Sequence, residues 1–385
     1  MRIALVCNYA PDGQQSMLRF GELLQSQLRA RGHEMTAFAP QPGGLALSRR
    51  WRGSAAKWVA YVDKYLVFPR QLARRLRQWE RADGRSVVHV VDHSNAVYVP
   101  RRRTRLPWIV TCHDLLAVRG ALGEEVGHST SALGRRLQAA IVAGQGRADA
   151  LVSVSAYTMR DVEQIVRPAQ PQLRRVAPLG LNHPYRRVAT AEARARLAGL
   201  GGCAWEVPFL LHVGSNLQRK NKAGVFRAFA RIADRWPGNL VFCGAELPDE
   251  VNAAARAAGL SARVFALRSP DNLQLEAAYS LAHALVFPSL CEGFGWPVIE
   301  AQACGCPVIC SDRTSLPEVG GAAALVHALE DEAGMGDSAL RLASPEFRAD
   351  VVARGYANLK RFDVAAMIDA YEQVYTEALA TCALR

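Results

Sequence analysis

The sequence contains no apolar run that approaches the roughly 20 residues needed to span a bilayer. It has no short-period repeat and no low-complexity tail, and its first residues, MRIALVCNYAPDG, indicate a strand and a turn rather than a signal peptide. The nine cysteines are scattered, mostly through apolar runs such as ALVCNY and LVFCGA, which is typical of reduced, buried thiols. These features together predict a cytoplasmic protein.

Two kinds of cofactor motif are also missing. No isolated Asp-x-Asp follows a predicted strand, and Cys304, Cys306 and Cys310 lack the further Cys or His pair that a zinc set requires. A dinucleotide-binding glycine fingerprint is absent, which argues against a dehydrogenase. We therefore expect neither a metal ion nor a resident cofactor.

The net charge of +12 is divided unevenly along the chain. Residues 1–190 hold 29 Lys and Arg against 13 Asp and Glu, a balance of +16, and the remainder holds 18 against 22, a balance of −4. A basic half of this kind predicts an anionic partner, whether nucleic acid, a phospholipid surface or a phosphate-bearing acceptor. No nucleic-acid-binding motif accompanies the charge, so we expect no nucleic-acid partner.

The basic residues cluster in 49–85 and in the run RRRTR at 101–105. Aromatic residues are interleaved with the first cluster, namely Trp51, Trp58, Tyr61, Tyr65, Phe68 and Trp79. Arginines mixed with aromatics are typical of a surface that lies on anionic headgroups, but a solvated helix face with long basic side chains has the same composition. We therefore expect either a solvated helix or peripheral contact with an anionic membrane surface.

Short β-rich runs alternate with helical segments from end to end, which predicts an α/β protein with parallel, doubly wound sheets. The predicted strands are 2–8, 35–40, 86–93, 107–114, 150–155, 174–180, 208–214, 239–245, 262–267, 283–289, 306–312 and 323–328. The pattern restarts after ATAEARARLAGLGG, so we expect an N-terminal domain at 1–185 and a C-terminal domain at 186–363. Ligands bind such sheets at the carboxyl ends of the strands, in a cleft that two such domains would form.

The stretch SLCEGFGWPVIEAQACGCPVI, residues 289–309, follows a buried strand with a glycine turn and a helix start. Pro297 suits the first turn of that helix, and glycines let the backbone approach a ligand closely. N–H groups at the helix start would meet an anion, while Glu292 and Glu300, eight positions apart, could accept hydrogen bonds from sugar and ribose hydroxyls. A phosphate between two such acids predicts a nucleotide-sugar site. The structural alternative is a capped helix with two exposed acids.

The run FPSLCEGFGWPVIEAQACGCPVICSDRTSLPEVGG closely resembles the glutamate–seven–glutamate signature of retaining glycosyltransferases of family 4. The resemblance spreads over most of the chain and is weaker in the N-terminal half. It implies the GT-B fold, with two Rossmann-like domains facing across a cleft and the last helix, 364–385, packed back on the first domain. It also implies a donor site for a nucleoside-diphosphate sugar of the UDP or GDP type. That site would be lined by Gly293, Phe294, Gly295 and Trp296, with Glu300 at the ribose.

Further site residues follow from this resemblance. The stretch HVGSNLQRKN, residues 212–221, follows a strand and opens a helix. At this point of the family's pattern a basic pair binds the donor diphosphate, which implies Lys220 with Arg219 beside it. Gly214, in the same stretch, would also line the donor site. Positioned cations agree with the charge that a leaving diphosphate gains. His113, in VTCHDL, resembles the family's histidine on the acceptor side, with a core or capping histidine as the alternative.

Other positions match less specific parts of the pattern. Gly13, in APDGQQS, lies where the family brings backbone N–H groups to the donor phosphates, although the double glycine often seen there is missing. Leu267 and Arg268 would border the nucleobase by family position, mainly through backbone atoms. Asp92 and His93, at the end of another predicted strand, give a weaker signal for the acceptor side.

The sequence therefore predicts a retaining, metal-independent hexosyltransferase that uses a nucleoside-diphosphate sugar. Glu292 would hold the sugar hydroxyls, His113 would lie near the reacting sugar, and retention would proceed by front-face attack without an enzymic nucleophile. The acceptor would be a glycan or a lipid-linked molecule in the assembly of bacterial exopolysaccharide, capsule or lipopolysaccharide. Two alternatives stay open: another GT-B enzyme, such as a nucleotide-sugar epimerase or phosphorylase, and a non-catalytic glycosyltransferase partner subunit.

Overall fold

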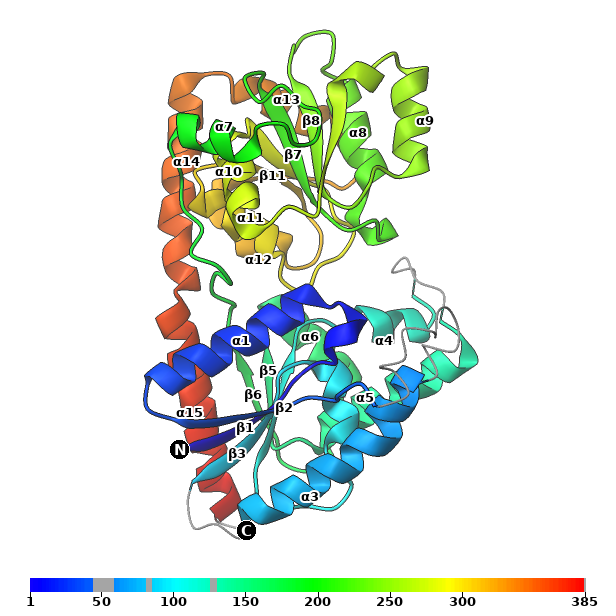
Figure 1. Cartoon of the computed structure of the whole chain (residues 1–385), viewed down its shortest axis with the longest axis vertical. Coiled ribbons are helices and arrows are strands. Elements are labelled where there is room, and N and C mark those ends of the chain that lie inside the picture. The colour runs from blue at the N-terminus through cyan, green and yellow to red at the C-terminus, as the bar shows by residue number, and fades with distance from the viewer. Residues whose placement is uncertain (44–58, 81–84, 125–129, 384–385) are drawn as a thin grey trace. The chain divides into compact units, whose positions relative to one another are not determined.

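The structure is a computed structural model that describes residues 1–43, 59–80, 85–124 and 130–383. The chain forms two compact units (Figure 1). Unit 1 contains residues 1–122, 130–177 and 365–385, and unit 2 is built mainly from residues 178–364. The chain thus passes from unit 1 to unit 2 at 177–178 and returns at 364–365, whereas the sequence placed these passages at 185–186 and 363–364.

Unit 1 contains a six-stranded parallel sheet in the order β2-β1-β3-β4-β5-β6. Its strands are β1 (Arg2–Val6), β2 (Glu34–Phe38), β3 (Ser86–Val90), β4 (Trp108–Cys112), β5 (Ala150–Ser153) and β6 (Leu173–Val176). Its longer helices are α1 (Gln15–Ala30), α3 (Phe68–Glu80), α4 (Leu116–Ala121), α5 (Ala132–Arg147), α6 (Ala156–Ile165) and α15 (Val364–Ala383). Every residue of β3 and β4 is buried, as expected for parallel strands that helices cover on both faces.

Unit 2 contains a second six-stranded parallel sheet in the order β12-β11-β10-β7-β8-β9. Its strands are β7 (Phe209–Gly214), β8 (Asn239–Gly244), β9 (Val264–Arg268), β10 (Ala284–Phe287), β11 (Val308–Ser311) and β12 (Ala324–His327). Its helices are α7 (Thr190–Leu197), α8 (Lys222–Ala230), α9 (Asp249–Ala257), α10 (Asn272–Leu281), α11 (Trp296–Ala303), α12 (Leu316–Gly320), α13 (Glu332–Arg341) and α14 (Pro345–Leu359). Counted within the unit, this is the Rossmann strand order 3-2-1-4-5-6.

The predicted α/β architecture with two doubly wound parallel sheets is confirmed. Each predicted strand overlaps a strand of the structure, because unbroken apolar runs between helical segments are a strong signal for covered parallel strands. Within the described ranges, no helix is both long and apolar enough to cross a membrane.

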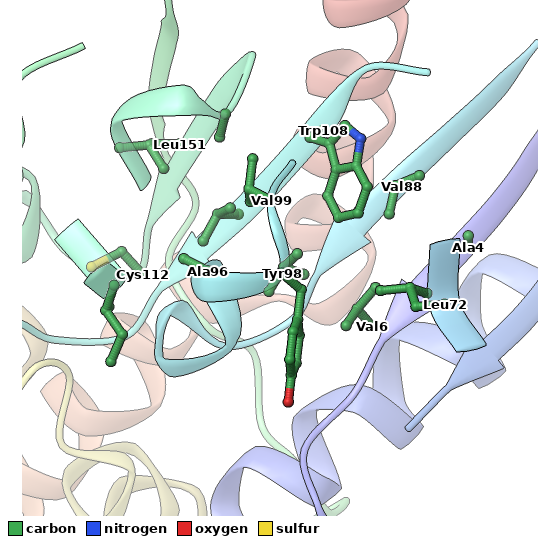
Figure 2. Packing of buried hydrophobic residues seen from close by; sticks show 14 of the residues in the cluster. Ala4, Val6, Leu72, Val88, Ala96, Tyr98, Val99, Trp108, Cys112 and Leu151 are labelled. Atoms are coloured by element: carbon green, nitrogen blue, oxygen red, sulfur yellow. The ribbon is translucent and has the colours of Figure 1, made fainter. Parts of the chain in front are cut away.

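The helical region before β3 differs in one respect from the prediction. Phe68 and Trp79 are 4% and 8% exposed and belong to the core of unit 1, so these two aromatics do not support the membrane contact that was one of the two alternatives for this region. With Leu72 and Leu76 they form the apolar stripe of α3, spaced by three and four residues. Figure 2 shows Leu72 among the strand residues that it contacts. Trp51 and Trp58 lie outside the described residues.

The opposite face of the same sheet carries a buried polar network. Alternate residues of a strand point to opposite faces, so Val88 faces α3 while His89 faces α15. The His89 ring nitrogens lie 2.8 Å from the Tyr375 hydroxyl and 2.8 Å from Thr111 Oγ1, and Thr111 Oγ1 lies 3.0 Å from the Tyr371 hydroxyl. Burial, followed by the charge of a neighbouring histidine, lowers the pKa of His89 to about 3. The neutral ring therefore ties α15 to β3 and β4.

We predict that Tyr375→Phe lowers the free energy of unfolding by about 1–3 kcal/mol, because the buried His89 nitrogen would lose its partner. Denaturant titration measures this change. The matched control is Tyr356→Phe. Tyr356 is 41% exposed, so this variant should change stability by less than about 0.5 kcal/mol. Equal stability of the two variants would show that the Tyr375 hydroxyl is not needed to hold α15.

Candidate functional site

The candidate site of unit 2 lies where the strand order of its sheet reverses. β7 and β10 are neighbours in the sheet, yet β7 leads to β8 on one side and β10 leads to β11 on the other. The loop after β7 contains the short helix η4 (Gln218–Lys220), and the glycine turn follows β10. The backbone N–H of Leu290 donates to the Arg219 carbonyl at 2.8 Å and joins the two loops. Ligands bind doubly wound sheets at such a reversal, outside the carboxyl ends of the strands.

Glu292 forms ion pairs with both predicted cations. One carboxylate oxygen accepts from Lys220 Nζ at 2.6 Å, and the other accepts from Arg219 Nη1 at 2.7 Å. Arg219 also donates to the Cys291 carbonyl at 3.1 Å. Glu292 is 6% exposed and Lys220 is 9% exposed, so these charges are largely removed from water. The structure thus brings together three residues that the sequence assigned to one site.

The charge state of Glu292 follows from this pairing. Burial alone would raise the pKa of the carboxyl, but Lys220 and Arg219 more than offset it and hold the pKa below its usual 4.5. Since the folded pKa is depressed, the pairing stabilises the fold above the unfolded value, and this stability is lost as the pH falls through the folded value. Glu292 is therefore ionised at neutral pH.

The turn that carries Glu292 is fixed by two hydroxyls from the loop after β11. The Glu292 backbone N–H donates to Thr314 Oγ1 at 2.9 Å, and Ser315 Oγ lies 2.9 Å and 3.0 Å from the carbonyls of Glu292 and Phe294. Gly295 has a φ of 96°, and a Cβ there would lie 2.8 Å from Leu316 Cδ2, so only glycine fits. Sequence reasoning missed Thr314 and Ser315, although the run SDRTSLPEV follows the motif directly.

Asn221 fixes the other loop, and sequence reasoning missed it as well. Its side chain accepts from the Gly224 N–H at 3.1 Å, which caps α8, and donates to the Pro288 carbonyl at 3.1 Å. Its φ of 50° lies in the left-handed region, which asparagine adopts more readily than most residues. The sequence signal for this role was an Asn directly before a helical segment, where Asn often caps the helix.

A second lysine lies beside this loop. Lys222 is 4% exposed, its Nζ donates to Asn216 Oδ1 at 2.7 Å, and burial lowers its pKa to about 8. A cavity of about 220 Å³ is lined by Asn216, Asn221, Lys222 and Leu290, among others. The carboxyl ends of β7 and β10 therefore combine three cationic side chains with one carboxylate.

The remaining residues of the predicted motif have distinct environments. Glu300 is 5% exposed, and its Oε2 accepts from the Tyr279 hydroxyl at 2.9 Å, so it is not an exposed acid. The Trp296 indole N–H donates to the Gly180 carbonyl at 3.0 Å, and the Phe294 ring packs edge-on against Phe362. These two aromatic side chains belong to the interior of unit 2, which leaves the backbone of the turn as their contribution to a ligand site.

The other predicted residues of unit 2 lie at neighbouring strand ends. Gly214 is the last residue of β7, and a Cβ there would lie 3.3 Å from Lys220 Cδ. Leu267 and Arg268 end β9; Leu267 is 3% exposed, whereas Arg268 is exposed and pairs with Glu246 at 2.8 Å. Leu267 could therefore contact a base only through its backbone.

Unit 1 gathers polar residues at the carboxyl edge of its own sheet. Asp92 follows β3, and its carboxylate accepts from Asn8 Nδ2 at 2.5 Å and from Ser94 Oγ at 2.6 Å. His113 follows β4 and donates from Nε2 to the Val91 carbonyl at 2.9 Å. Asn8, which follows β1, was not singled out from the sequence, since a single Asn before a turn carries little signal.

Burial lowers the pKa of His113, although the charge of Asp92 opposes this. Burial would raise the pKa of Asp92, but His93, His113 and the hydrogen bonds from Ser94 and Asn8 lower it overall. With Nε2 donating to a carbonyl, the neutral His113 ring presents Nδ1 as an acceptor. Gly13, also at this edge, adopts a φ of 68°, and no atom lies within 4 Å of a Cβ placed there.

Within the ranges that the structure describes, no group of three or more His, Cys, Asp or Glu side chains is arranged to hold a metal ion. The chemistry available at both edges is that of fixed charges, hydrogen-bond donors and backbone amides. Such a set can bind and stabilise an anion without a metal.

The two sheets and their connections define a two-domain GT-B glycosyltransferase fold. The sucrose-phosphate synthase of Thermosynechococcus elongatus superposes with a TM-score of 0.77 at 20% identity, over 99% of this chain and 100% of that one. An Anabaena protein solved with UDP and glucose gives a TM-score of 0.70 at 15% identity, over 98% and 100% of the two chains. At these identities the likeness concerns the fold.

The sequence comparisons identify the family. Residues 205–333 match the family model of the group 1 glycosyl transferases, and residues 22–183 match that of glycosyltransferase family 4. The D-inositol 3-phosphate glycosyltransferase of Saccharomonospora viridis is 30% identical over 307 residues, which cover 74% of this chain and 67% of that protein. The chain therefore belongs to the group 1 glycosyltransferases.

Other relatives match over shorter stretches. The O-antigen chain mannosyltransferase B of Escherichia coli is 44% identical over 94 residues, which cover 24% of each chain. A serotype-specific mannosyltransferase of Escherichia coli is 27% identical over 256 residues, 60% of this chain and 29% of that protein. For three of the curated relatives that it matches, this chain covers only 24% to 64% of the relative's length.

We predict that Asn221→Ala destabilises the protein more than Asn221→Gly. Both variants lose the cap of α8 and the bond to Pro288, but only glycine adopts the left-handed φ without strain. Loss of such a cap to alanine costs about 0.5–2 kcal/mol, and loss to glycine costs a few tenths. Denaturant unfolding of both variants measures the difference. A glycine variant as unstable as the alanine variant would show that backbone strain at this position does not matter.

Proposed function

We propose that the protein is a retaining glycosyltransferase that moves a hexose from a nucleoside-diphosphate sugar to an acceptor hydroxyl. The observation that carries the proposal is the buried ion pairing of Glu292 with Arg219 and Lys220 at the strand reversal of a Rossmann sheet. Family membership supports the general activity, and the fold likeness to a protein solved with UDP and glucose agrees with a nucleotide-sugar donor.

Lys220 and Arg219 stabilise the departing diphosphate in this proposal. Glycosyl transfer moves negative charge onto the diphosphate as the sugar bond breaks, and cations fixed in a low-dielectric site stabilise that charge most strongly. Glu292 already fixes both cations, so the site is organised before the donor binds. The Glu292 carboxylate also holds hydroxyls of the donor sugar, whose ring develops positive charge in the transition state.

Glu300 holds the ribose, and the backbone around Leu267 and Arg268 borders the base. Glu300 accepts from the Tyr279 hydroxyl of α10 through Oε2, and this bond restricts the orientation of the carboxylate. The N–H groups of the turn at Gly293 and Gly295 and the positive end of the α11 dipole face the phosphates.

His113, with Asp92 beside it, lies near the reacting sugar. Attack from the face of the departing diphosphate retains the configuration, and no protein carboxylate then needs to act as a nucleophile. The chemistry uses no metal ion, because the two cations of the β7 loop provide the charge.

The acceptor is a glycan or a lipid-linked molecule of bacterial surface polysaccharide assembly. Two relatives are named as mannosyltransferases, one of them for the O-antigen chain, which supports a mannose-like hexose and a lipopolysaccharide acceptor. Other relatives are named as D-inositol 3-phosphate glycosyltransferases, which supports an acceptor that carries phosphate. A thermal-shift screen with UDP, GDP and ADP identifies the base. Release of nucleoside diphosphate with transfer of the sugar to an added acceptor distinguishes a transferase from an epimerase, a phosphorylase or a binding subunit.

We predict that Lys220→Ala weakens nucleoside-diphosphate binding, whereas Glu292→Gln does not. Lys220→Ala removes a cation, so it should weaken binding and raise the transfer barrier by about 2–4 kcal/mol. Glu292→Gln releases both cations from their carboxylate, so binding should be kept or strengthened while transfer is severely reduced. Calorimetric titration and saturating-donor kinetics measure the two effects.

The matched control is Lys360→Ala, an exposed lysine of unit 2 outside the site, which should leave both quantities unchanged. Transfer by Lys220→Ala within twofold of the parent would contradict the role of Lys220. A loss of affinity in Glu292→Gln equal to its loss of rate would contradict the separate role of Glu292.

We also propose that the region before α3 rests on an anionic membrane surface. Its exposed apolar residues are Tyr61, Val62, Leu66 and Val67, which are 40–53% exposed. Exposed arginines follow on α3, among them Arg70, Arg74 and Arg77. An apolar patch beside arginines is typical of surfaces that insert shallowly between anionic headgroups. This would bring the protein to a lipid-linked acceptor.

We predict that the protein co-sediments with anionic liposomes at low salt and is released at 1 M salt, where the Debye length falls to about 3 Å. Charge reversal of Arg74, Arg75 and Arg77 should weaken this binding, since each basic residue near an anionic surface contributes about 1 kcal/mol. Activity on a soluble acceptor analogue should stay unchanged. Equal binding to neutral and anionic vesicles, or none, would leave this region an ordinary solvated surface.

A further inference from the structure

A cavity of about 550 Å³ lies in unit 1 at the amino edge of its sheet, opposite the edge with His113. Trp108, which lines it, is the first residue of β4, and His113 follows the last. Five strand residues at about 3.3 Å each separate the two edges by roughly 17 Å. The cavity is therefore distinct from the polar residues at the carboxyl edge.

The cavity is strongly basic. Arg101, Arg102, Arg103, Arg105 and Arg147 line it, and Asp149 is the one carboxylate among its lining residues. Asp149 already accepts from the Trp108 N–H at 2.8 Å and from Gln170 Nε2 at 3.1 Å. Within the described part of the chain, the four arginines of the 101–105 run form no salt bridge. Five arginines, four of them exposed, thus line the cavity together with a single carboxylate.

Arg147 is the deepest of these cations and is incompletely bonded. Its Nη2 donates to the Val99 carbonyl at 3.1 Å, but its Nε is buried without a hydrogen-bond partner. Burial, followed by the charge of Arg101, lowers the pKa of its guanidinium. A buried donor without a partner is unfavourable, and an anion in the cavity would provide the missing acceptor.

The loop that carries the arginines is held in place despite their mutual repulsion. Thr104 Oγ1 donates to the Leu106 carbonyl at 2.9 Å and accepts from the Trp108 indole N–H at 3.1 Å. The Arg105 carbonyl accepts from Cys382 Sγ of α15 at 3.4 Å. A hydrogen bond within the loop and side chains of β4 and α15 therefore hold the basic loop in place.

An apolar cavity adjoins the basic one. Its volume is about 170 Å³, and its lining is mostly apolar, with Leu72 and Leu76 of α3 and Tyr98, although Arg77 and Glu80 also line it. It shares Pro100, Thr104 and Trp108 with the basic cavity, so the two cavities are adjacent. A free sugar phosphate or inorganic phosphate would leave this second cavity exposed to water.

We infer that the two cavities together bind one molecule of a lipid phosphate, with its phosphate among Arg101, Arg103 and Arg147 and the start of its chain against α3. Charge complementarity selects the phosphate, and the adjoining apolar wall selects a hydrocarbon chain over a soluble phosphate. Because this edge of the sheet is remote from His113, the bound lipid anchors the protein rather than receiving the sugar. The inference does not depend on the proposed transfer reaction.

The test is calorimetric titration of the whole protein with decyl phosphate below its critical micelle concentration. We expect one site per chain and binding at least about tenfold tighter than that of inorganic phosphate or of decanol, since the burial of a few methylenes provides such a factor. Arg101→Glu/Arg103→Glu should weaken the binding at least about tenfold. The matched control, Arg29→Glu/Arg136→Glu, makes the same charge change at exposed arginines outside the cavity and should bind as the parent does.

A second pair of variants tests the apolar cavity alone. Ala73 is exposed and lines that cavity, so Ala73→Glu should weaken decyl phosphate binding at least about fivefold and leave the weak binding of inorganic phosphate within twofold. Gln78→Glu makes the same charge change on α3 outside the cavity and should have no effect.

The inference is overturned if decyl phosphate binds no more tightly than inorganic phosphate or decanol, or if the arginine variant binds like its control. Binding to vesicles of anionic phospholipid without binding of the single molecule would also overturn it, because the arginines would then serve a surface rather than a pocket. Loss of transferase activity in any assay does not bear on this result, since the titration requires no donor.

Discussion

The arrangement of unit 2 depends on one buried carboxylate that neutralises two cations from a different loop. Glu292 follows β10, Arg219 and Lys220 follow β7, and each of the three charges would be unfavourable in this position alone. Parallel strands make the pairing possible, since their carboxyl ends meet at the same edge, and the strand reversal leaves room between the connections. The glycine turn and the Ser315 hydroxyl then fix the carboxylate, so the charges are placed before any ligand arrives. In water the same ions would have to reorganise as a ligand binds, whereas in this site folding has already placed them.

Unit 1 uses buried neutral groups where unit 2 uses charges. His89 is held uncharged between the hydroxyls of Tyr375 and Thr111, and this network ties the last helix to the first sheet. The next strand end carries His113, whose ring packs edge-on against Phe20 of α1 at 4.8 Å between centroids. Phe20 in turn packs against Tyr371 of α15 at 6.1 Å between centroids, so helices from both ends of the chain support the position of His113.

The fold was predictable from the sequence because its strands are short, unbroken apolar runs between helical segments, and this signal is local. The placement of Glu292 and Lys220 in one site was predictable only through family resemblance, since no local rule joins residues 72 positions apart, and their ion pair was not predicted. The roles of Asn221 and Ser315 became visible only with the backbone positions that they bond. The burial of Phe68 and Trp79 was predictable from their helical spacing with Leu72, but the mixture of aromatics and arginines in this region is also typical of a membrane-facing surface.

The excess positive charge of the first half does not form one uniform basic surface. Arg2 stacks on Trp79 and forms an ion pair with Glu34 at 3.2 Å, so its charge is balanced within the protein. The 101–105 run differs because its arginines line a cavity together with the half-buried Arg147, whose Nε is buried without a hydrogen-bond partner. Net charge alone could not separate these cases, since both contribute equally to it. What separates them is whether a carboxylate of the protein pairs with the guanidinium: Arg2 has Glu34, whereas the arginines of the 101–105 run form no salt bridge with the described residues.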